Sequence, residues 1–540
     1  MKTETMEIIY VDAQGMKKRL RSLSVPEGME VQLHPISAGE KELAAAFQAA
    51  MEQSEAKYKI YISSDIEILQ KEILAELITA FRAHPEVGVL GLSGTKRILT
   101  SGITYNSPQR RGVVLDVKRK ALTGAAAAEP CETVQALDSY FLATQYDVPW
   151  RKDILQGVLF LGASACCEQR RAGHEAAVLA QKQPACRMIS SQFAVNDEMR
   201  AAFLDEYSKD LYPLVSVVIP TYQRPEYFRQ ALESAQKQTY RNLDIFVTDN
   251  SHNDETEEVY KKYFADDPRI HYEHHSEFNA KGNWYCAMAY DNPEAEYVNW
   301  LMDDDIFAPK KIATMMDFYF VYPDVTFVTS YRSLIDENGN VLPDKSWSKP
   351  ICDHTARLSG DEVGRLLLQS TINYLGEPTT ALLRKKYMLD GGRLGWTGKE
   401  GKYQISDFPT WFCLMSQGDF IYITEPLSSF RQHNSQQHQN LDTHFGGLIC
   451  WTMMIQAAIE RNVFLQKDID KRKAIIQWLK YADENVIAMK DYPKDVWERT
   501  YVQDFLKAYA GMAGSLSNGY HVEYDIDTTR PKGIYQGDTV

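Results

Sequence analysis

The chain has 540 residues, of which 44% are hydrophobic and 24% are charged. This is more than one hydrophobic core usually organises, so we expect two or three domains. Lys and Arg total 59 against 73 Asp and Glu, which gives a formal net charge of -14. The negative net charge argues against a protein that coats nucleic acid or an anionic membrane, and it favours a small or neutral partner.

The sequence contains no recognisable targeting signal. The opening residues, MKTETMEIIYVD, lack the basic and apolar regions of a signal peptide, and no run of 18 or more apolar residues occurs. The eight cysteines have no zinc-binding spacing and are too sparse for a disulfide scaffold. We expect a cytoplasmic protein with reduced thiols and no transmembrane segment; a peripheral position at the inner face of the membrane stays open.

Strands and helices alternate along the N-terminal part of the chain. The pattern predicts strands at 6–12, 29–37 and 58–63, with helices at 15–23 and 41–54 between them. Such a rhythm implies a parallel sheet covered by helices.

The same rhythm restarts after a charged, helix-like stretch at 201–213, so we place a domain boundary near 207–213. Apolar strands and amphipathic helices follow at 215–222, 226–238, 243–250, 257–264 and 297–305. Residues 295–328 can also be laid over residues 56–90 with one single-residue gap, which we interpret as a tandem duplication. From 441 onward only helical patterns occur, before a loose tail.

The strongest local signal is the run Asp303-Asp304-Asp305, directly after an apolar strand. Three adjacent carboxylates repel one another unless a cation lies among them. At the carboxyl end of a parallel strand, their oxygens would suit Mg²⁺ or Mn²⁺ bridging to a diphosphate. A solvated acidic turn is the alternative.

Residues 213–440 resemble the family 2 glycosyltransferases, which invert the anomeric configuration and have the GT-A fold. The ordered motifs are Pro220-Thr221-Tyr222-Gln223-Arg224, Gln238-Thr239-Tyr240 and Asp249-Asn250. The resemblance implies an α/β chain with two tandem GT-A-like (Rossmann-like, mostly parallel) modules, 1–209 and 210–440, and a helical extension, 441–540. It further implies transfer of a sugar from a nucleotide-diphosphate sugar, with a UDP-sugar favoured, to an acceptor hydroxyl.

The resemblance also assigns residues to the donor. The loop that starts at Pro220 would surround the base and phosphates, Asp249 would accept a hydrogen bond from the base, and Asp303 would lie near the ribose. A capping role before residues 251–258 is the alternative for Asp249. The full set of expected nucleotide-sugar contacts is Pro220, Thr221, Tyr222, Arg224, Asp249, Lys281, Asn283, Asp303 and Arg431.

The resemblance also assigns metal ligands and a catalytic base. Met302 stands where the family's first metal-motif Asp would be, so the resemblance leaves Asp304, Asp305 and His433 as ligands of Mn²⁺ or Mg²⁺. Asp407 lies where the family's catalytic base opens a helix, and a helix cap is its alternative role. Residues 431–439 would form a lid that excludes water.

The first module resembles a related glycosyltransferase-like family through residues 135–150 and 168–173. Gly162 occupies the position that matches Asp407, and Asp65 is the one carboxylate that matches the acidic triplet. We therefore expect a degenerate module that serves acceptor binding, dimerisation or buttressing; a second active site built from other residues is the alternative.

Other functions stay open at this stage. The protein could be a non-catalytic sugar-nucleotide-binding scaffold, a nucleotidyltransferase of similar fold, or a phosphoryl-transfer enzyme or hydrolase. A nucleotidyltransferase would need a Gly-rich phosphate loop, and a phosphoryl-transfer enzyme or hydrolase would need a second set of carboxylates. We find neither in the sequence. The acceptor would be a glycan, a lipid-linked molecule or a protein, in surface polysaccharide, glycolipid or glycoprotein synthesis, and a homo-oligomer is also open.

Overall fold

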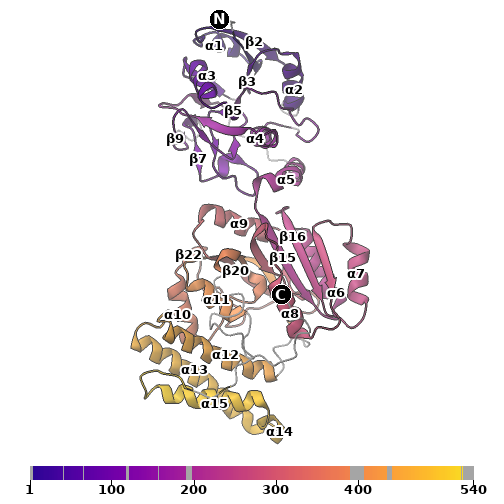
Figure 1. Cartoon of the computed structure of the whole chain (residues 1–540), viewed down its shortest axis with the longest axis vertical. Coiled ribbons are helices and arrows are strands. Elements are labelled where there is room, and N and C mark those ends of the chain that lie inside the picture. Colours follow the sequence, from indigo (N-terminus) through magenta and orange to yellow (C-terminus); the bar gives the residue numbers. More distant parts are fainter. Residues whose placement is uncertain are drawn as a thin grey trace. The chain divides into compact units, whose positions relative to one another are not determined.

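The structure is a computed structural model that describes residues 4–39, 42–64, 66–116, 121–155, 157–189, 197–388, 407–433, 441–523 and 526. The chain divides into two compact units, Met1–Tyr212 and Pro213–Val540 (Figure 1). None of the helices in the described ranges has the length and apolar character that a membrane span would need.

The first unit is built on a seven-stranded sheet with the order β10-β13-β5-β12-β3-β1-β2. The strands predicted from the sequence are confirmed as β1, β2 and β3, which pair in parallel. All five residues of β3 are buried, as expected for an inner strand that helices cover on both faces. The strands of this sheet are β1 (Glu4–Val11), β2 (Met29–Ile36), β3 (Tyr58–Ile62), β5 (Val87–Gly91), β10 (Cys131–Thr133), β12 (Phe141–Thr144) and β13 (Glu175–Leu179).

Two smaller sheets and five α-helices complete the described part of this unit. The sheets have the orders β11-β6-β7 and β4-β14-β8-β9. Their strands are β4 (Ile66–Ile68), β6 (Gly94–Thr95), β7 (Arg110–Arg111), β8 (Val114–Asp116), β9 (Ala121–Thr123), β11 (Ala136–Leu137) and β14 (Cys186–Met188). The helices are α1 (Met16–Leu20), α2 (Leu43–Gln53), α3 (Ile73–Ala83), α4 (Leu161–Arg171) and α5 (Asp197–Leu211).

The second unit has a ten-stranded sheet with the order β17-β16-β15-β18-β23-β20-β24-β19, to which β21 and β22 are attached. The first four strands of this order are parallel, so their carboxyl ends meet at one edge. The strands are β15 (Leu214–Thr221), β16 (Leu243–Asp249), β17 (Ile270–His274), β18 (Ala295–Trp300), β19 (Ile306–Phe307), β20 (Phe327–Ile335), β21 (Val341–Leu342), β22 (Ala356–Leu358), β23 (Ala381–Arg384) and β24 (Phe420–Arg431).

The two large sheets share a strand order. In the first unit β13-β5-β12-β3-β1-β2 are neighbours, and in the second β24-β20-β23-β18-β15-β16 follow in the same sense and with the same parallel and antiparallel pairings. The mixed α/β fold with two tandem modules is therefore confirmed. A duplication would produce this order, and it stays our interpretation.

Helices cover the second sheet and extend beyond it. Those that precede the C-terminal part are α6 (Pro225–Gln236), α7 (Glu255–Tyr263), α8 (Ala280–Ala289), α9 (Lys311–Val321), α10 (Gly360–Ser370) and α11 (Asp407–Met415). They are followed by α12 (Leu441–Glu460), α13 (Asp468–Ala488), α14 (Lys494–Trp497) and α15 (Thr500–Ser515).

The C-terminal helices share one hydrophobic core with the sheet. Figure 1 shows α12, α13 and α15 stacked beside α10 and α11, and a single buried cluster runs from Val218 on β15 to Met512 on α15. The ring of Phe412 on α11 packs edge-on against Trp451 and at a tilt against Phe464. These helices therefore belong to the same compact unit as the second sheet.

We predict that Trp478→Ala destabilises the second unit by about 3–5 kcal/mol, because the ring is fully buried and its Nε1 donates to the carbonyl of Leu448 at 3.1 Å. Ile487→Ala on the same helix is the control, since that side chain is 64% exposed. Urea unfolding followed by proteolysis measures both, with the first unit as internal reference. Equal effects of the two substitutions would show that the C-terminal helices do not support this core.

Candidate functional site

Asp303 joins the acidic triplet to the loop after β15. Its carboxylate accepts hydrogen bonds from Thr221 Oγ1 at 3.0 Å and Tyr222 N at 3.3 Å, and it pairs with Arg224 at 2.8 Å. Burial and the neighbouring Asp304 raise the pKa of Asp303 to about 7, even though Arg224 acts in the opposite direction. The predicted contact residues Thr221, Tyr222, Arg224 and Asp303 are thus brought together.

Asp304 faces two nitrogen-bearing side chains. Its Oδ2 lies 2.7 Å from Arg224 Nη1 and 2.9 Å from His433 Nε2. Burial alone would raise the pKa of Asp304, but the His433 hydrogen bond and the Arg224 charge outweigh it and lower that pKa. His433 arrives from the end of β24, 129 residues further along the chain.

Asp305 points to a different side. Its Oδ2 accepts from Thr379 Oγ1 at 2.5 Å and its Oδ1 from the backbone N of Arg431 at 3.2 Å. Burial, with the charges of Asp304 and Glu377, raises its pKa well above the ordinary value. Both oxygens of Asp305 are therefore directed to protein donors, which suits a supporting role better than the expected role as a metal ligand.

Within the acidic triplet and its neighbours, the pair Asp304 and His433 could hold a divalent ion. A carboxylate oxygen and an imidazole nitrogen 2.9 Å apart share a hydrogen bond that an ion between them would replace. Oxygen and imidazole ligands together suit Mn²⁺, whereas Mg²⁺ prefers oxygen ligands. Arg224 also contacts both groups, at 2.7 and 3.3 Å, so an ion there would have to share Asp304 with the guanidinium.

The expected base-binding side of the site lies at the end of β16. Thr221 and Asp249 are paired in register on neighbouring strands, directly after Pro220 and Thr248. Asp249 is fully buried, and it accepts from Ser251 N at 2.8 Å and from Tyr272 Oη at 2.5 Å. Tyr222 is 39% exposed, so its ring can be reached by a ligand.

Asn283 ties three elements together. Its amide donates to the carbonyls of Thr221 and Thr248, both at 3.1 Å, and its Oδ1 accepts from Thr248 Oγ1 at 2.7 Å. The side chain is buried, and these contacts join α8 to β15 and β16. They give Asn283 a positioning role within the protein, and its expected contact with the nucleotide stays a prediction. The side chain of Lys281 lies outside the described residues.

Arg431 is likewise used within the protein. Its Nε donates to the carbonyl of Asp304 at 2.9 Å, and its Nη2 to Gln230 Oε1 at 2.8 Å. Its Nη1 donates to the carbonyls of Asp336 and Glu337, at 3.2 and 3.0 Å. These contacts fix the backbone behind the acidic triplet, which is a different use from the expected contact with a diphosphate. Of the expected lid, residues 434–439 lie outside the described residues.

Asp407 opens α11, and its Oδ2 accepts from Asn373 Nδ2 at 3.3 Å. The same Asn373 amide donates to the carbonyl of Gly376 at 2.9 Å. The chain then continues through Glu377, which pairs with buried Arg332 at 3.0 Å, to Thr379, which holds Asp305. The short segment 373–379 therefore connects the start of α11 with the acidic triplet.

Sequence patterns gave no sign of several of these partners. Tyr272 on β17, Gln230 on α6 and Arg332 on β20 hold Asp249, Arg431 and Glu377 respectively. Each is an ordinary residue within a strand or helix pattern. Only their position in the folded sheet brings them to the site.

The first unit differs at the matching place. Gly162 lies in the first turn of α4, which directly precedes β13 in the chain, as α11 directly precedes the corresponding strand β24. A Cβ on Gly162 would come within 2.2 Å of the carbonyl oxygen of Leu137, so no side chain fits there. Asp65 lies outside the described residues.

A buried ion pair lies beside Gly162. Asp138 pairs with Arg110 and accepts from Ser93 and, at 2.6 Å, from Thr104. Burial tends to raise the pKa of Asp138, but Arg110 and the hydroxyl groups lower it to about 2. This carboxylate is fully engaged in holding the fold.

The chain contains two glycosyltransferase-like domains, as two family models show. Residues 216–387 match the family model described as glycosyl transferase family 2, and residues 9–207 match the one described as glycosyltransferase like family. Asp407, Arg431 and His433 lie beyond the matched part of the second domain.

Curated relatives are also named as glycosyltransferases. An uncharacterized glycosyltransferase of Rickettsia felis is 27% identical over 265 residues, which is 47% of this chain and 40% of the relative. An uncharacterized glycosyltransferase of Methanocaldococcus jannaschii is 35% identical over 132 residues, 24% of this chain and 45% of the relative. The GalNAc(5)-diNAcBac-PP-undecaprenol beta-1,3-glucosyltransferase of Campylobacter jejuni is 31% identical over 104 residues, 19% of this chain and 34% of the relative. The chain spans less than two thirds of the length of these relatives.

Among solved structures, S. aureus TarS 1–349 in complex with UDP-GlcNAc has a TM-score of 0.36 and 12% identity, and the match covers 60% of this chain and 98% of that chain.

We predict that Asn283→Ala lowers the stability of the second unit by about 1–3 kcal/mol without any nucleotide present, because it leaves buried hydrogen-bonding groups of β15 and β16 unpaired. Asn338→Ala, at an exposed turn, is the control and should leave the melting temperature unchanged. Thermal unfolding of the ligand-free protein measures both. Unchanged stability together with weaker nucleotide binding would restore Asn283 as a direct ligand contact.

Proposed function

We propose that the second unit transfers a sugar from a nucleotide-diphosphate sugar to an acceptor hydroxyl, in a metal-dependent reaction with inversion. The observation that carries the proposal is the convergence of Asp303, Asp304 and His433 with the Thr221–Arg224 loop, at the carboxyl edge of a parallel sheet. Ligands bind at this edge in open α/β folds. The match to glycosyl transferase family 2 supports the reaction class.

The leaving group is a nucleoside diphosphate, which departs only if its developing charge is balanced. We assign the metal to Asp304 and His433, and Mn²⁺ or Mg²⁺ bound there would supply that positive charge. Asp305 accepts from the Thr379 hydroxyl and from the backbone N of Arg431, and so holds both residues behind the site. Arg224 adds a permanent cation beside Asp303 and Asp304.

We propose that Asp407 is the catalytic base, which accepts the proton of the acceptor hydroxyl. Its place at the start of α11 exposes the carboxylate to the helix N-terminus, where a negative charge is favourable. Asn373 donates to one oxygen and orients the group toward the segment that reaches the acidic triplet. Attack of the acceptor oxygen in line with the departing diphosphate inverts the anomeric configuration, and no covalent intermediate is needed.

The donor base would lie against Asp249 and the partly exposed ring of Tyr222, with a UDP-sugar as the favoured donor. The Campylobacter relative is named as a glucosyltransferase whose substrate carries a PP-undecaprenol group. That name favours a lipid-linked acceptor over a free glycan or a protein.

The first unit would support this reaction without catalysing one. Gly162 leaves no room for a base, and Asp138 is committed to Arg110. Acceptor binding, dimerisation or buttressing of the second unit are the roles that remain for it.

A thermal-shift panel of nucleotide sugars, each with and without Mn²⁺, tests the proposed function. A true donor at 100 times its Kd should stabilise the second unit by about 2.7 kcal/mol, and more with the metal than without it. Release of the nucleotide in the presence of an acceptor then separates an enzyme from a binding scaffold. A donor that binds but never releases its nucleotide would favour the scaffold.

We predict that Asp304→Ala abolishes transfer and removes the Mn²⁺-dependent part of donor binding, with little change in fold. Asp65→Ala, at the matching position of the first unit, is the control and should keep full transfer. Donor turnover and Mn²⁺ titrations compare the two variants. Normal, chelator-sensitive turnover of Asp304→Ala would refute the metal assignment, and loss of a distinct transfer step in Asp65→Ala would show a second active site.

We predict that Asp407→Asn lowers the turnover rate at least ~10²-fold with donor affinity nearly intact, because the amide keeps the shape of the side chain but cannot accept a proton. Single-turnover rates and donor Kd values separate the two effects. An equal loss of donor binding would instead identify Asp407 as a helix cap.

A further inference from the structure

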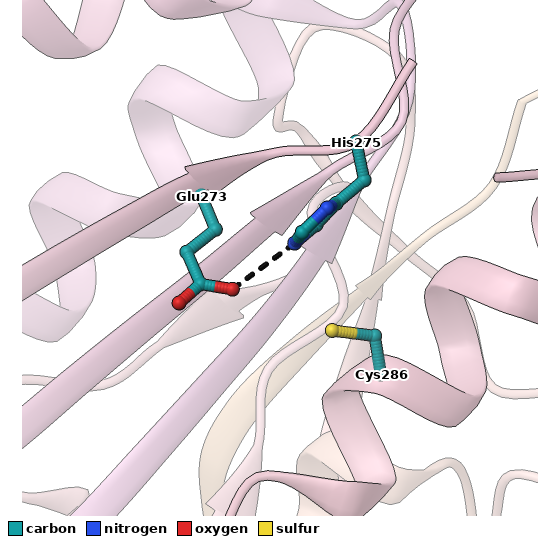
Figure 2. Close-up of side chains that lie close together, drawn as sticks. All are labelled: Glu273, His275 and Cys286. Carbon is teal, nitrogen blue, oxygen red and sulfur yellow. Dashed lines mark hydrogen bonds and ion pairs between the residues drawn. The ribbon is translucent and has the colours of Figure 1, made fainter. Parts of the chain in front are cut away.

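Three potential metal ligands from two elements meet at the carboxyl end of β17. Glu273 lies on β17, His275 directly follows it, and Cys286 lies on α8. Their ligand atoms all lie within 4.8 Å of one another. Figure 2 shows the carboxylate, the ring and the thiol facing one common space. None of the three belongs to the site described above.

Local geometry explains why these side chains converge. Residues two apart in an extended segment point to the same side, so Glu273 and His275 share a face. Helix α8 packs over the neighbouring strands β15 and β16 and brings Cys286 to that face. The His275 Nε2 lies 3.0 Å from Glu273 Oε2.

The imidazole of His275 is also held in place from outside the group. Its Nδ1 lies 3.5 Å from a carboxylate oxygen of Glu277, and its ring stacks on Phe278 with centroids 4.5 Å apart. Metal-binding histidines usually have a carboxylate beside the second ring nitrogen, and Glu277 lies on that side of the ring at ion-pair distance. Nε2 is thereby left as the ligand atom.

We propose that Glu273, His275 and Cys286 bind a zinc-type divalent cation. Oxygen, imidazole and thiolate ligands together are the set that Zn²⁺ accepts, whereas a thiolate disfavours Mg²⁺ and Ca²⁺. Three protein ligands leave the fourth tetrahedral position to water. This site is separate from the pair Asp304 and His433, and the inference does not rest on the proposed sugar transfer.

An ion at this place would clamp α8 to the sheet. The backbone N of His275 donates to the carbonyl of Asp249 at 2.7 Å, and Asn279 caps α8 through the backbone N of Gly282. The ion would therefore fix the segment 275–282 beside the carboxyl end of β16. A thiol coordinates a metal as the thiolate, so binding of the ion would release the proton of Cys286 to solvent.

A second group of three, Asp254, Glu257 and His274, lies on the other side of this strand end. It has no thiol, Glu257 pairs with Lys261 at 2.7 Å, and His274 Nε2 contacts the carbonyl of Ser251 at 2.8 Å. We assign the ion to the group that contains Cys286, because its thiol adds the soft ligand that the second group lacks.

Co²⁺ titration of the tag-free, metal-depleted, full-length protein tests the assignment, since Co²⁺ reports thiolate ligation by a charge-transfer band. We expect that band to saturate at one equivalent and to disappear when Zn²⁺ is added. Cys286→Ser should abolish the band. Glu273→Gln, an exposed position that should not affect folding, and His275→Gln should each weaken binding about 10-fold or more.

Cys131→Ser is the matched control, a partly buried thiol of the first unit, and should keep the band. Thermal melts of each ligand-free variant verify that it is folded. Co²⁺ binding without a thiolate band, a band that survives Cys286→Ser, or unchanged affinity in Glu273→Gln and His275→Gln would overturn the proposal. Loss of binding in His274→Gln alone would assign the ion to the other group and would also overturn it.

Discussion

The architecture of the second unit depends on how three consecutive carboxylates are kept apart at one strand end. Buried like charges cannot all be ionised without compensation. The protein separates them by direction: Asp303 faces the loop after β15, Asp304 faces Arg224 and His433, and Asp305 faces Thr379 and the backbone of Arg431. Each direction recruits a different part of the chain. The triplet is thereby the point at which the Thr221–Arg224 loop, β24 and the segment 373–379 are held together.

Asp304 contacts Arg224 and is also the proposed metal ligand. The net charge around it therefore depends on whether a metal ion and a nucleotide are bound. In the protein alone, the Arg224 guanidinium compensates the charge of Asp304, and His433 is hydrogen-bonded to the same carboxylate. A divalent ion would add two positive charges where one guanidinium already lies, and a diphosphate would bring the negative charge that both cations can then share. Metal and nucleotide are expected to bind cooperatively for this reason, since each compensates the charge that the other introduces.

Sequence patterns predicted the parallel strands and the acidic triplet because those features are local. Strand β15, helix α6 and strand β16 begin and end within two residues of the expected positions. The uses of Asn283 and Arg431 could not be read in the same way, because their partners are set by strand order and by turns far along the chain. The group of Glu273, His275 and Cys286 was missed for a related reason. Its ligands have no recognised spacing, and only the packing of α8 on the sheet brings the thiol to the histidine.

The contact at Gly162 has a consequence for the first unit. A carboxylate cannot be introduced at this position through one substitution, because even a methyl group would overlap the carbonyl oxygen of Leu137. Helix α4 would first have to move away from β11, and the packing around Asp138 and Arg110 would have to change with it. Each of these steps alone would disturb the packing, so the position is closed to a side chain unless several changes occur together.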